Sequence, residues 1–276
     1  MSQTFPTTSD TQAESLDVLR PPFDPNLKHP KELLGLADDL DVQLAPAAKF
    51  QETGSWASPR RSATLATSMA YSSVEYRLAP EYQAPAGLDD CYNGLVWVSK
   101  HASELGINPD QLLVYGCSGG GPLAAASVLL ARQQQSPPIR AQMLVCPILD
   151  DRDNTVSAKQ FEHGTVWCGK MNRQAWDLVI GRNMRGSHHV TELIAPARAT
   201  NLKDLPPTFI DAGECEVFRD EAVAYASKLW EAGVSAELHI WQGGYHGFDQ
   251  LQPESSIAQA SKAAKKAWIS RLFRNI

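Results

Sequence analysis

Ser118 lies between glycines in the five residues GCSGG, where a short apolar run ends and an alanine- and leucine-rich run begins. These residues match G-x-S-x-G, a strand-to-helix turn that holds a serine in a strained conformation with its hydroxyl exposed. The flanking glycines are needed because side chains there would collide with the neighbouring strand or helix. The turn predicts Ser118 as a nucleophile; the alternative is a glycine-rich turn that serves close packing alone.

A serine hydroxyl becomes a good nucleophile when a histidine takes its proton and a carboxylate orients that histidine. His246 is the preferred base because it lies in WQGGYHGF, a glycine-lined loop after the last expected strand. Five other histidines are better explained as structural or solvated, by their places in the chain: His29, His101, His188, His189 and His239.

The orienting carboxylate should come from the loop GECEVFRDE, which follows the strand expected over TFIDAG. This loop offers Glu214, Glu216, Asp220 and Glu221. Glu216 is the preferred candidate, because Asp220 and Glu221 open the next helix and are placed to cap it. The three residues then follow one another along the chain as serine, acid and histidine, which is the usual order in proteins that contain this type of turn.

Alternating strands and helices are expected around these residues. Apolar runs predict strands over 71–79, 111–116, 141–149, 208–213 and 236–242, and helical spacing predicts helices over 86–104, after residue 118 and over 219–233. The alternation indicates a parallel sheet with helices on both faces. Residues 151–205 interrupt it with a tryptophan-bearing helical insertion, which is expected to form a lid.

Taken together, these segments resemble the hormone-sensitive-lipase family of α/β-hydrolase esterases. The resemblance covers residues 71–250 through SVEYRLAPEYQAPAGLDDCYNGLVW, GCSGGGPLAAASVLLAR, CPILDDR, APARATNLKDLPPTFIDAGECEVFRDE and GGYHGF, in that order. It implies an α/β-hydrolase fold with a mostly parallel sheet, flanking helices and a helical lid. It also implies Ser118 as nucleophile, His246 as base and Glu216 at the acid position, while Cys117 departs from the family's usual GDSAGG.

The chain departs from the family more seriously at the oxyanion hole. Family members carry an HGGG motif upstream of YRLAPE, and its glycine N–H groups supply most of that hole. Between residues 38 and 75 the only glycine is Gly54, so early strands are expected to be missing or altered together with the motif. Gly119 supplies the one clearly retained donor. Three explanations stay open: residues 50–56 rebuild the hole, the protein is a degenerate relative, or the sequence represents a truncated or misassembled gene product.

The resemblance implies a cofactor-independent carboxylic ester hydrolase that forms an acyl-enzyme on a small-molecule ester. Short acyl esters are the implied substrates, including esters of secondary metabolites. Trp167 and Trp176, in the expected lid, suggest an apolar substrate pocket. A non-catalytic binding protein on the same scaffold is the alternative, because the HGGG loop is absent. Amide or peptide hydrolysis by the same three residues is a third interpretation, which differs only in the leaving group.

Composition argues against several other classes of protein. Of the 276 residues, 43% are hydrophobic and 20% charged, and the net charge of −6 leaves no basic surface for nucleic acid. No metal is expected, because there is no H-E-x-x-H and the pair His188-His189 lacks helical ligand spacing. The five cysteines form no C-x-x-C pair, so they are expected to be reduced and mostly buried.

The remaining expectations concern location and organisation. Neither a signal peptide nor an apolar stretch long enough to span a bilayer is visible, which predicts a cytoplasmic protein. Residues 1–35 are expected to form a flexible tail with cap helices, and residues 36–276 a single α/β-hydrolase domain. Nothing in the sequence indicates an oligomeric state.

Overall fold

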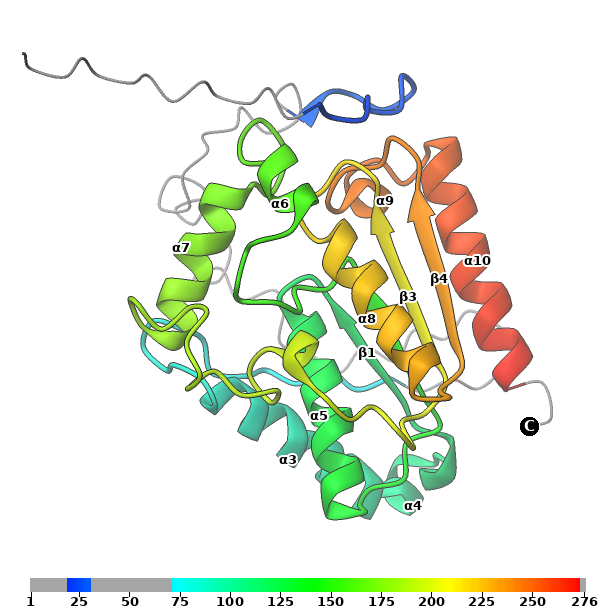
Figure 1. Ribbon diagram of the computed structural model, residues 1–276. Coiled ribbons are helices and arrows are strands. Elements are labelled where there is room, and N and C mark those ends of the chain that lie inside the picture. Colours follow the sequence, from blue (N-terminus) through cyan, green and yellow to red (C-terminus); the bar gives the residue numbers. More distant parts are fainter. Residues whose placement is uncertain (1–18, 31–70, 274–276) are drawn as a thin grey trace, which may run out of the picture.

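A four-stranded parallel sheet forms the centre of the protein in the computed structural model, which describes residues 19–30 and 71–273 (Figure 1). The strands follow one another across the sheet in the order β1 Leu113–Cys117, β2 Ala141–Val145, β3 Thr208–Gly213 and β4 Ala236–Trp241. All three pairings are parallel. The expected α/β fold, and the strands expected over 111–116, 141–149, 208–213 and 236–242, are therefore confirmed within a few residues.

Helices connect and cover these strands. Their bounds are α3 Ala86–Lys100, α4 Ala102–Leu105, α5 Gly120–Gln134, α6 Val156–Gln160, α7 Gly169–Ile180, α8 Arg219–Glu231, α9 Phe248–Leu251 and α10 Ser256–Leu272, with short 3-10 turns at Pro109–Gln111 and Pro196–Arg198. The helices expected around residues 86–104, after residue 118 and over 219–233 are present as α3 with α4, as α5 and as α8.

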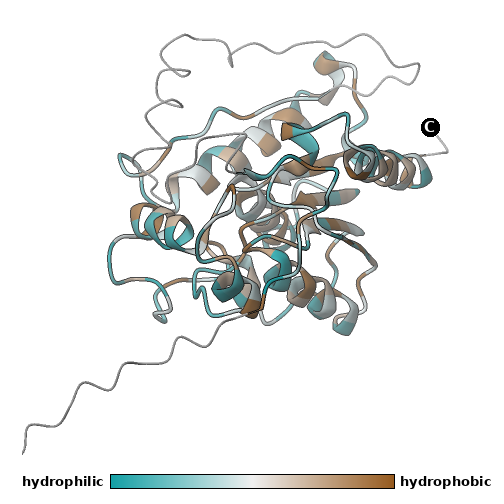
Figure 2. Cartoon of the chain, turned by 90° about the horizontal axis from the view of Figure 1, so that it is seen from above, coloured by the Kyte–Doolittle hydropathy of each residue, from teal (hydrophilic) through white to brown (hydrophobic). Residues whose placement is uncertain are grey.

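The two faces of the sheet are covered by different helices because successive strand residues point to opposite faces. Leu144 and Ile210 pack with α5 and α8 in one buried cluster. Met143 and Phe209 face the other way and pack with Trp268 of α10. The helices carry both hydrophobic and hydrophilic residues, as helices that cover a sheet require (Figure 2).

The insertion between β2 and β3 is helical, as expected, and contains α6 and α7. Its side chains join a second buried cluster that includes Phe161, Trp176 and Phe218, the last of these from the loop after β3. The insertion therefore lies over the carboxyl end of β3, and its role as a lid stays a prediction. Among the residues with described placement, no helix is long and apolar enough to cross a membrane.

The strand expected over 71–79 is wrong, because no strand forms there. Arg77 instead pairs with Asp90 of α3 at 2.9 Å, and Val74 packs closely over Gly94 of the same helix. Within the described ranges, β1 pairs only with β2. A strand needs a neighbouring ladder for its backbone hydrogen bonds, and this segment binds a helix instead.

Residues 19–30 lie against the loop that follows β4. The N–H of Asp24 donates to the carbonyl of Gly243 at 2.9 Å, and Leu27 packs with Tyr245 in a buried cluster. The rest of the expected tail and cap helices, the region where early strands are expected to be missing or altered, and the candidate oxyanion segment 50–56 fall outside the described residues. The proposed domain boundary near residue 35 also lies there and stays a prediction.

Candidate functional site

Ser118 occupies a sharp turn between β1 and α5, at the carboxyl edge of the sheet. Its φ of 52° lies in the left-handed region, which a non-glycine residue adopts only when its surroundings impose it. Two backbone hydrogen bonds hold the turn: the Ser118 N–H donates to Val145 O at 2.9 Å, and the Gly121 N–H donates to Ser118 O at 2.8 Å. The serine is therefore held by the neighbouring strand as well as by its own helix.

Close packing explains the glycines of this turn, but not all of those expected. A side chain at Gly116 would place its Cβ 2.3 Å from the carbonyl oxygen of Gly120, so the first motif glycine is required. At Gly120 the same Cβ would meet nothing within 4 Å, so the expectation that the second motif glycine avoids a collision is wrong. The next residue has that role, because a Cβ at Gly121 would lie 2.6 Å from the Cβ of Pro147.

The structure brings Ser118, His246 and Glu216 together in one hydrogen-bonded chain. Ser118 Oγ lies 2.9 Å from Nε2 of His246, although 128 residues separate them in sequence. The other ring nitrogen, Nδ1, lies 2.6 Å from a carboxylate oxygen of Glu216. The second carboxylate oxygen of Glu216 accepts the N–H of Gly213 at the end of β3. Both imidazole nitrogens are thus engaged, which orients the ring between serine and acid.

Burial and charge act in opposite directions on the imidazole. Glu216 is fully buried and His246 is 8% exposed. Burial lowers the pKa of His246, but the charge and hydrogen bond of Glu216, with smaller contributions from Cys117 and Asp249, outweigh it, so the pKa is raised. A raised pKa strengthens the ring as a proton acceptor and stabilises the imidazolium that forms when the serine loses its proton.

Glu216 is distinguished from the neighbouring carboxylates by its contacts. Glu214 accepts the N–H of Gly243 at 2.9 Å, and Asp220 accepts the N–H of Ser157 at 2.7 Å. Glu221 accepts the N–H of Leu149 at 2.8 Å. Asp220 and Glu221 do lie in the first turn of α8, but neither side chain caps that helix, so this part of the expectation is wrong. Their side chains instead join α8 to the segments that follow β2.

Two aromatic side chains lie close to the imidazole. The ring of Trp167 lies 6.4 Å from that of His246 between centroids, and the ring of Phe218 meets it edge-on at 5.2 Å. Trp176 lies in the buried cluster of the insertion and is 4% exposed, and among the described residues the rings in contact with His246 are those of Trp167 and Phe218. Phe218 was not a candidate from sequence, although it follows Glu216 by two residues in the same loop.

Gly119 lies at the N-cap of α5, beside the Ser118 hydroxyl. Within residues 19–30 and 71–273, its backbone N–H has no hydrogen-bond acceptor. The residue is exposed, and a helix N-terminus favours negative charge. One N–H donor is therefore available where an oxyanion would form next to Ser118.

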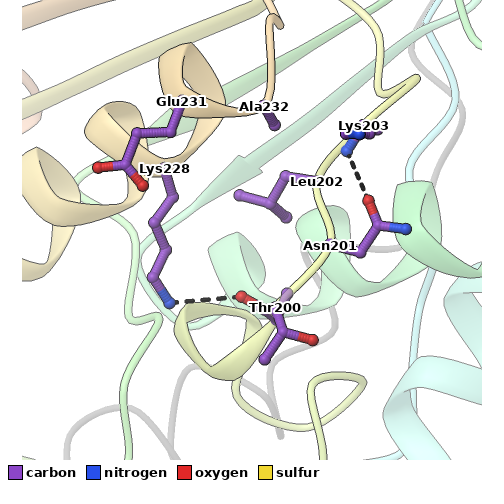
Figure 3. A pocket seen from close by; sticks show the side chains of 8 residues that line it. Thr200, Asn201, Leu202, Lys203, Lys228, Glu231 and Ala232 are labelled. Atoms are coloured by element: carbon purple, nitrogen blue, oxygen red, sulfur yellow. Dashed lines mark hydrogen bonds between the residues drawn. The ribbon is translucent and has the colours of Figure 1, made fainter.

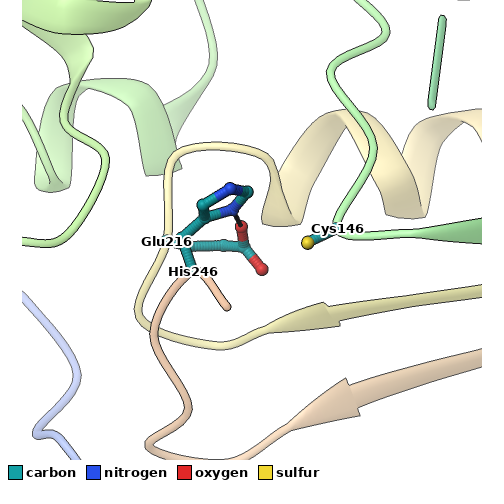
Figure 4. A group of neighbouring side chains, drawn as sticks. All are labelled: Cys146, Glu216 and His246. Atoms are coloured by element: carbon teal, nitrogen blue, oxygen red, sulfur yellow. Dashed lines mark hydrogen bonds and ion pairs between the residues drawn. The ribbon is translucent and has the colours of Figure 1, made fainter. Parts of the chain in front are cut away.

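Cys146 is a second site residue that sequence reasoning missed, and it lies against the acid and base. One donor atom from each of Cys146, Glu216 and His246 lies within 4.8 Å of the others (Figure 4). Such a set could ligate a metal, but the carboxylate and imidazole already bond to each other and to the serine. Its chemistry is better explained as an acid–base pair with a thiol beside it.

A surface cavity of about 560 Å³ lies elsewhere, between the turn before β3 and the end of α8 (Figure 3). Leu202, Lys203, Lys228 and Glu231 are among its lining residues. Glu216 precedes the start of α8, whereas this cavity lies at the helix's other end, next to the amino edge of the sheet. It is therefore separate from Ser118 and His246.

With this geometry established, comparison with known proteins defines the class. A family profile described as alpha/beta hydrolase fold matches residues 53–250, and the chain belongs to this family, the hormone-sensitive-lipase-like group that the motifs resemble. The expected recognition and fold class are thus confirmed. The matched range includes residues 53–70, which lie outside the described residues.

Several of the curated relatives are named as esterases. Carboxylesterase NlhH of Mycobacterium tuberculosis is 35% identical over 181 residues, and an arylesterase of Saccharolobus solfataricus is 34% identical over 187 residues. Each alignment covers 64% of this chain, and 55% and 56% of the two relatives. The chain therefore spans about half the length of the curated relatives it matches.

Solved structures give the same result. A bacterial heroin esterase superposes with a TM-score of 0.70 and 38% identity, over 72% of this chain and 63% of that protein. Esterase LipW of Mycobacterium marinum superposes with a TM-score of 0.67 and 37% identity, over 72% of this chain and 61% of that protein. The described residues thus share the fold of esterases over much, but not all, of the relatives' length.

Proposed function

We propose that this protein is a serine hydrolase that cleaves carboxylic esters through an acyl-enzyme on Ser118. The observation that carries the proposal is the hydrogen-bonded chain in which Ser118 Oγ, the imidazole of His246 and the carboxylate of Glu216 follow one another at 2.9 and 2.6 Å. This sequence of contacts is the one that activates a serine hydroxyl in unrelated hydrolases. The esterase names of the relatives support the same conclusion.

In the proposed reaction, Ser118 Oγ attacks the carbonyl carbon of the ester while Nε2 of His246 takes the hydroxyl proton. Glu216 holds the ring through Nδ1–H and stabilises the imidazolium. The tetrahedral intermediate then collapses as His246 gives its proton to the departing alcohol oxygen. A water molecule attacks the acyl group in the second half-reaction, with His246 again acting as base, and releases the acid and the free serine.

The oxyanion of each tetrahedral intermediate would accept a hydrogen bond from the N–H of Gly119. Removing one such donor costs about 100- to 1000-fold in turnover, so an enzyme with Gly119 alone would be weakened. The family's usual HGGG donors are absent from the sequence. Efficient turnover in the proposed mechanism therefore needs a second donor beside Gly119.

The proposed substrates are small esters with a short acyl group. Trp167 is half-buried and Phe218 fully buried, and both present aromatic surface to the imidazole. The partly exposed ring of Trp167 is an aromatic surface that favours uncharged, apolar ligands, whereas the buried Phe218 packs against the imidazole. Short-acyl esters of secondary metabolites fall within this class.

A second candidate function is ligand binding without catalysis on the same scaffold. The observation that favours it is the absent HGGG motif, since the loss of donors to the oxyanion slows the attack step. The intact contact between Ser118 and His246 favours the esterase instead. The two functions differ in one measurable property, the reactivity of the Ser118 hydroxyl.

The decisive experiment labels the purified full chain with a fluorophosphonate probe and follows hydrolysis of p-nitrophenyl acetate in parallel. Wild-type protein is expected to label and to turn over, and Ser118→Ala to do neither. Ser103→Ala is a matched control, because Ser103 is exposed on α4, away from the candidate site. A folded wild type that neither labels nor hydrolyses would contradict the esterase proposal and favour the binding protein.

A further inference from the structure

Two cysteine thiols lie side by side immediately next to the candidate nucleophile. Cys117 ends β1 and directly precedes Ser118, and Cys146 directly follows β2. Their Sγ atoms are 3.8 Å apart, close enough for one thiol to donate to the other. The five cysteines of the chain are free in this structure, and the proposed ester hydrolysis uses none of them.

The backbone at Cys146 is what brings its thiol to Cys117. Cys117 is the register partner of Val145, and alternation along β2 would turn the next side chain to the opposite face of the sheet. Cys146 instead has a φ of 38°, in the left-handed region that a residue with a Cβ rarely adopts. Both thiols consequently join the cluster on the α10 face. Strained conformations of this kind concentrate at functional sites.

The two thiols differ in their acid–base properties. The hydrogen bond from Cys146, opposed by burial and assisted by the charge of His246 and the amide of Gln250, lowers the pKa of Cys117 to about 7. The same hydrogen bond and burial raise the pKa of Cys146 well above its usual value. Cys117 is thus partly ionised near neutral pH while the thiol in contact with it stays protonated, a pattern typical of an attacking and a resolving cysteine.

We propose that Cys117 and Cys146 are a peroxide-sensitive modification site that closes to a disulfide beside the candidate nucleophile. In the first step the Cys117 thiolate attacks one oxygen of hydrogen peroxide, the O–O bond breaks, and a sulfenic acid forms as hydroxide leaves and takes up a proton. In the second step the sulfur of Cys146 attacks that of Cys117, the S–O bond breaks, and water departs. The two thiols lose two electrons, and the peroxide is reduced to two waters.

Closing the bond should displace the serine. The sulfur atoms must move from 3.8 Å to about 2.05 Å apart, which is the length of a disulfide. Cys117 and Cys146 flank the bond from the Ser118 N–H to Val145 O, and the Cys146 N–H itself donates to Asp211 O at 2.7 Å. A displacement of about 1 Å between reacting groups can cost about 100-fold in rate, so oxidation is expected to reduce the reactivity of Ser118 by about that factor.

The first test is chemical and does not depend on the proposed function. The full chain is treated with hydrogen peroxide, its remaining thiols are alkylated under denaturing conditions, and the digest is mapped by mass spectrometry. The expected product is a linked peptide pair that contains Cys117 and Cys146 and disappears after treatment with dithiothreitol. A folded, oxidised protein in which both residues are still alkylated, or in which Cys117 joins another cysteine, would overturn the proposal.

The second test joins the disulfide to the serine and rests on the proposed function. Fluorophosphonate labelling of the wild type should slow about 100-fold after oxidation and recover with dithiothreitol. Cys91→Ser is the matched control and should respond like wild type, because Cys91 lies on α3 and burial raises the pKa of its thiol to about 11. Cys146→Ser should form no linked peptide and should leave a sulfenic acid on Cys117 that dimedone traps.

The outcomes separate the two proposals. Untreated protein that does not label contradicts the hydrolase, whereas the peptide map still tests the cysteine pair. A linked pair that leaves labelling unchanged would overturn the coupling to Ser118. If Cys146→Ser does not fold, the dithiothreitol-reversible loss in wild type and Cys91→Ser still decides whether the disulfide controls the site.

Discussion

The carboxyl edge of the sheet and the outer side of β1 are built differently. At the carboxyl edge, Glu216 and His246 are 0% and 8% exposed, and their polar side-chain atoms are hydrogen-bonded. On the side of β1 and α3, large apolar side chains face solvent in the described structure. Those between 44% and 60% exposed are Tyr71, Leu78, Tyr82, Trp97 and Tyr115.

The difference follows from what each region packs against. β2 and β3 have a strand on either side and helices on both faces, whereas β1 pairs with β2 alone among the described residues. α3 buries only Leu88, while α5 buries residues along most of its length. The residues of the candidate site therefore lie among the well-packed elements, between the end of β1 and the start of α9. Changes there should have large effects, and changes on the outer side of β1 should have small ones.

The largest effect is expected from His246→Ala. Loss of the base in a serine hydrolase costs about 10⁶-fold in kcat, because the three residues act as a unit. Hydrolysis of p-nitrophenyl acetate by the purified variant measures it. His101→Ala is the control from the other region, since His101 stacks on Trp97 at the end of α3, and it should keep wild-type activity. Equal losses in the two variants would contradict the proposed base.

Glu216→Gln is expected to reduce kcat by about 10⁴-fold, because the amide no longer stabilises the imidazolium. It should also move the pH profile. His246 acts as base when neutral, so activity falls below its pKa, which Glu216 helps to raise. Without that charge, burial lowers the pKa and the acid limb of kcat/KM shifts to lower pH. Glu214→Gln is the control, because Glu214 lies in the same loop but its carboxylate accepts the N–H of Gly243 and not that of the imidazole. This variant should leave the acid limb of kcat/KM unchanged.

Phe209→Ala tests the core that supports the carboxyl edge. Phe209 is fully buried in β3 and packs against Trp268 with ring centroids 5.6 Å apart. Truncating a buried phenylalanine costs about 3–5 kcal/mol in the free energy of unfolding. Urea denaturation followed by circular dichroism measures this loss. A loss below about 1 kcal/mol would show that the core can repack around the missing ring.

Gly116→Ala and Gly120→Ala form a matched pair within the turn. A methyl group at Gly116 would overlap the Gly120 carbonyl and the Cβ of Ala124, and overpacking of this kind costs about 1–3 kcal/mol. At Gly120 the methyl group points into open space, so the Tm should stay constant or rise slightly. Thermal melts of both variants measure the difference. The reverse ranking would contradict the packing described for this turn.

The smallest effect is expected from Tyr115→Thr on the outer side of β1. Tyr115 is 56% exposed, and threonine keeps a good strand-forming side chain, so the free energy of unfolding should change by no more than about 0.5 kcal/mol. Urea denaturation under the same conditions as for Phe209→Ala compares the free energies of unfolding of the two variants directly. A loss as large as that of Phe209→Ala would mean that this side of β1 is covered in solution.

Local patterns in the sequence predicted much of the fold. Four strands and the helices between them have strong apolar periodicity, and the glycines around Ser118 predicted the strand-to-helix turn that the structure contains. The choice of Glu216 also agrees with the contact to His246. The predictions of strands, helices and the turn succeeded because these local preferences act over a few residues and need no knowledge of distant neighbours.

Other features depend on neighbours that the sequence does not specify. The segment 71–79 has the composition of a strand but binds α3 through Arg77, since strand formation requires an adjacent ladder. Asp220 resembles a helix cap but accepts the N–H of Ser157 from a different helix. The requirement for glycine falls on Gly121 instead of Gly120, because Pro147 comes from the segment after β2.

The sequence by itself determined which chemical groups are available and in what order: a serine in a glycine turn, four carboxylates after a strand, and a histidine in a glycine-lined loop. The tertiary structure alone decided which carboxylate reaches the imidazole, and that the thiols of Cys117 and Cys146 lie 3.8 Å apart. The physical reason is that hydrogen bonds form only within a few tenths of an ångström of their optimal length. Such distances between remote loops follow from strand register, backbone dihedrals and packing, which no short stretch of sequence contains.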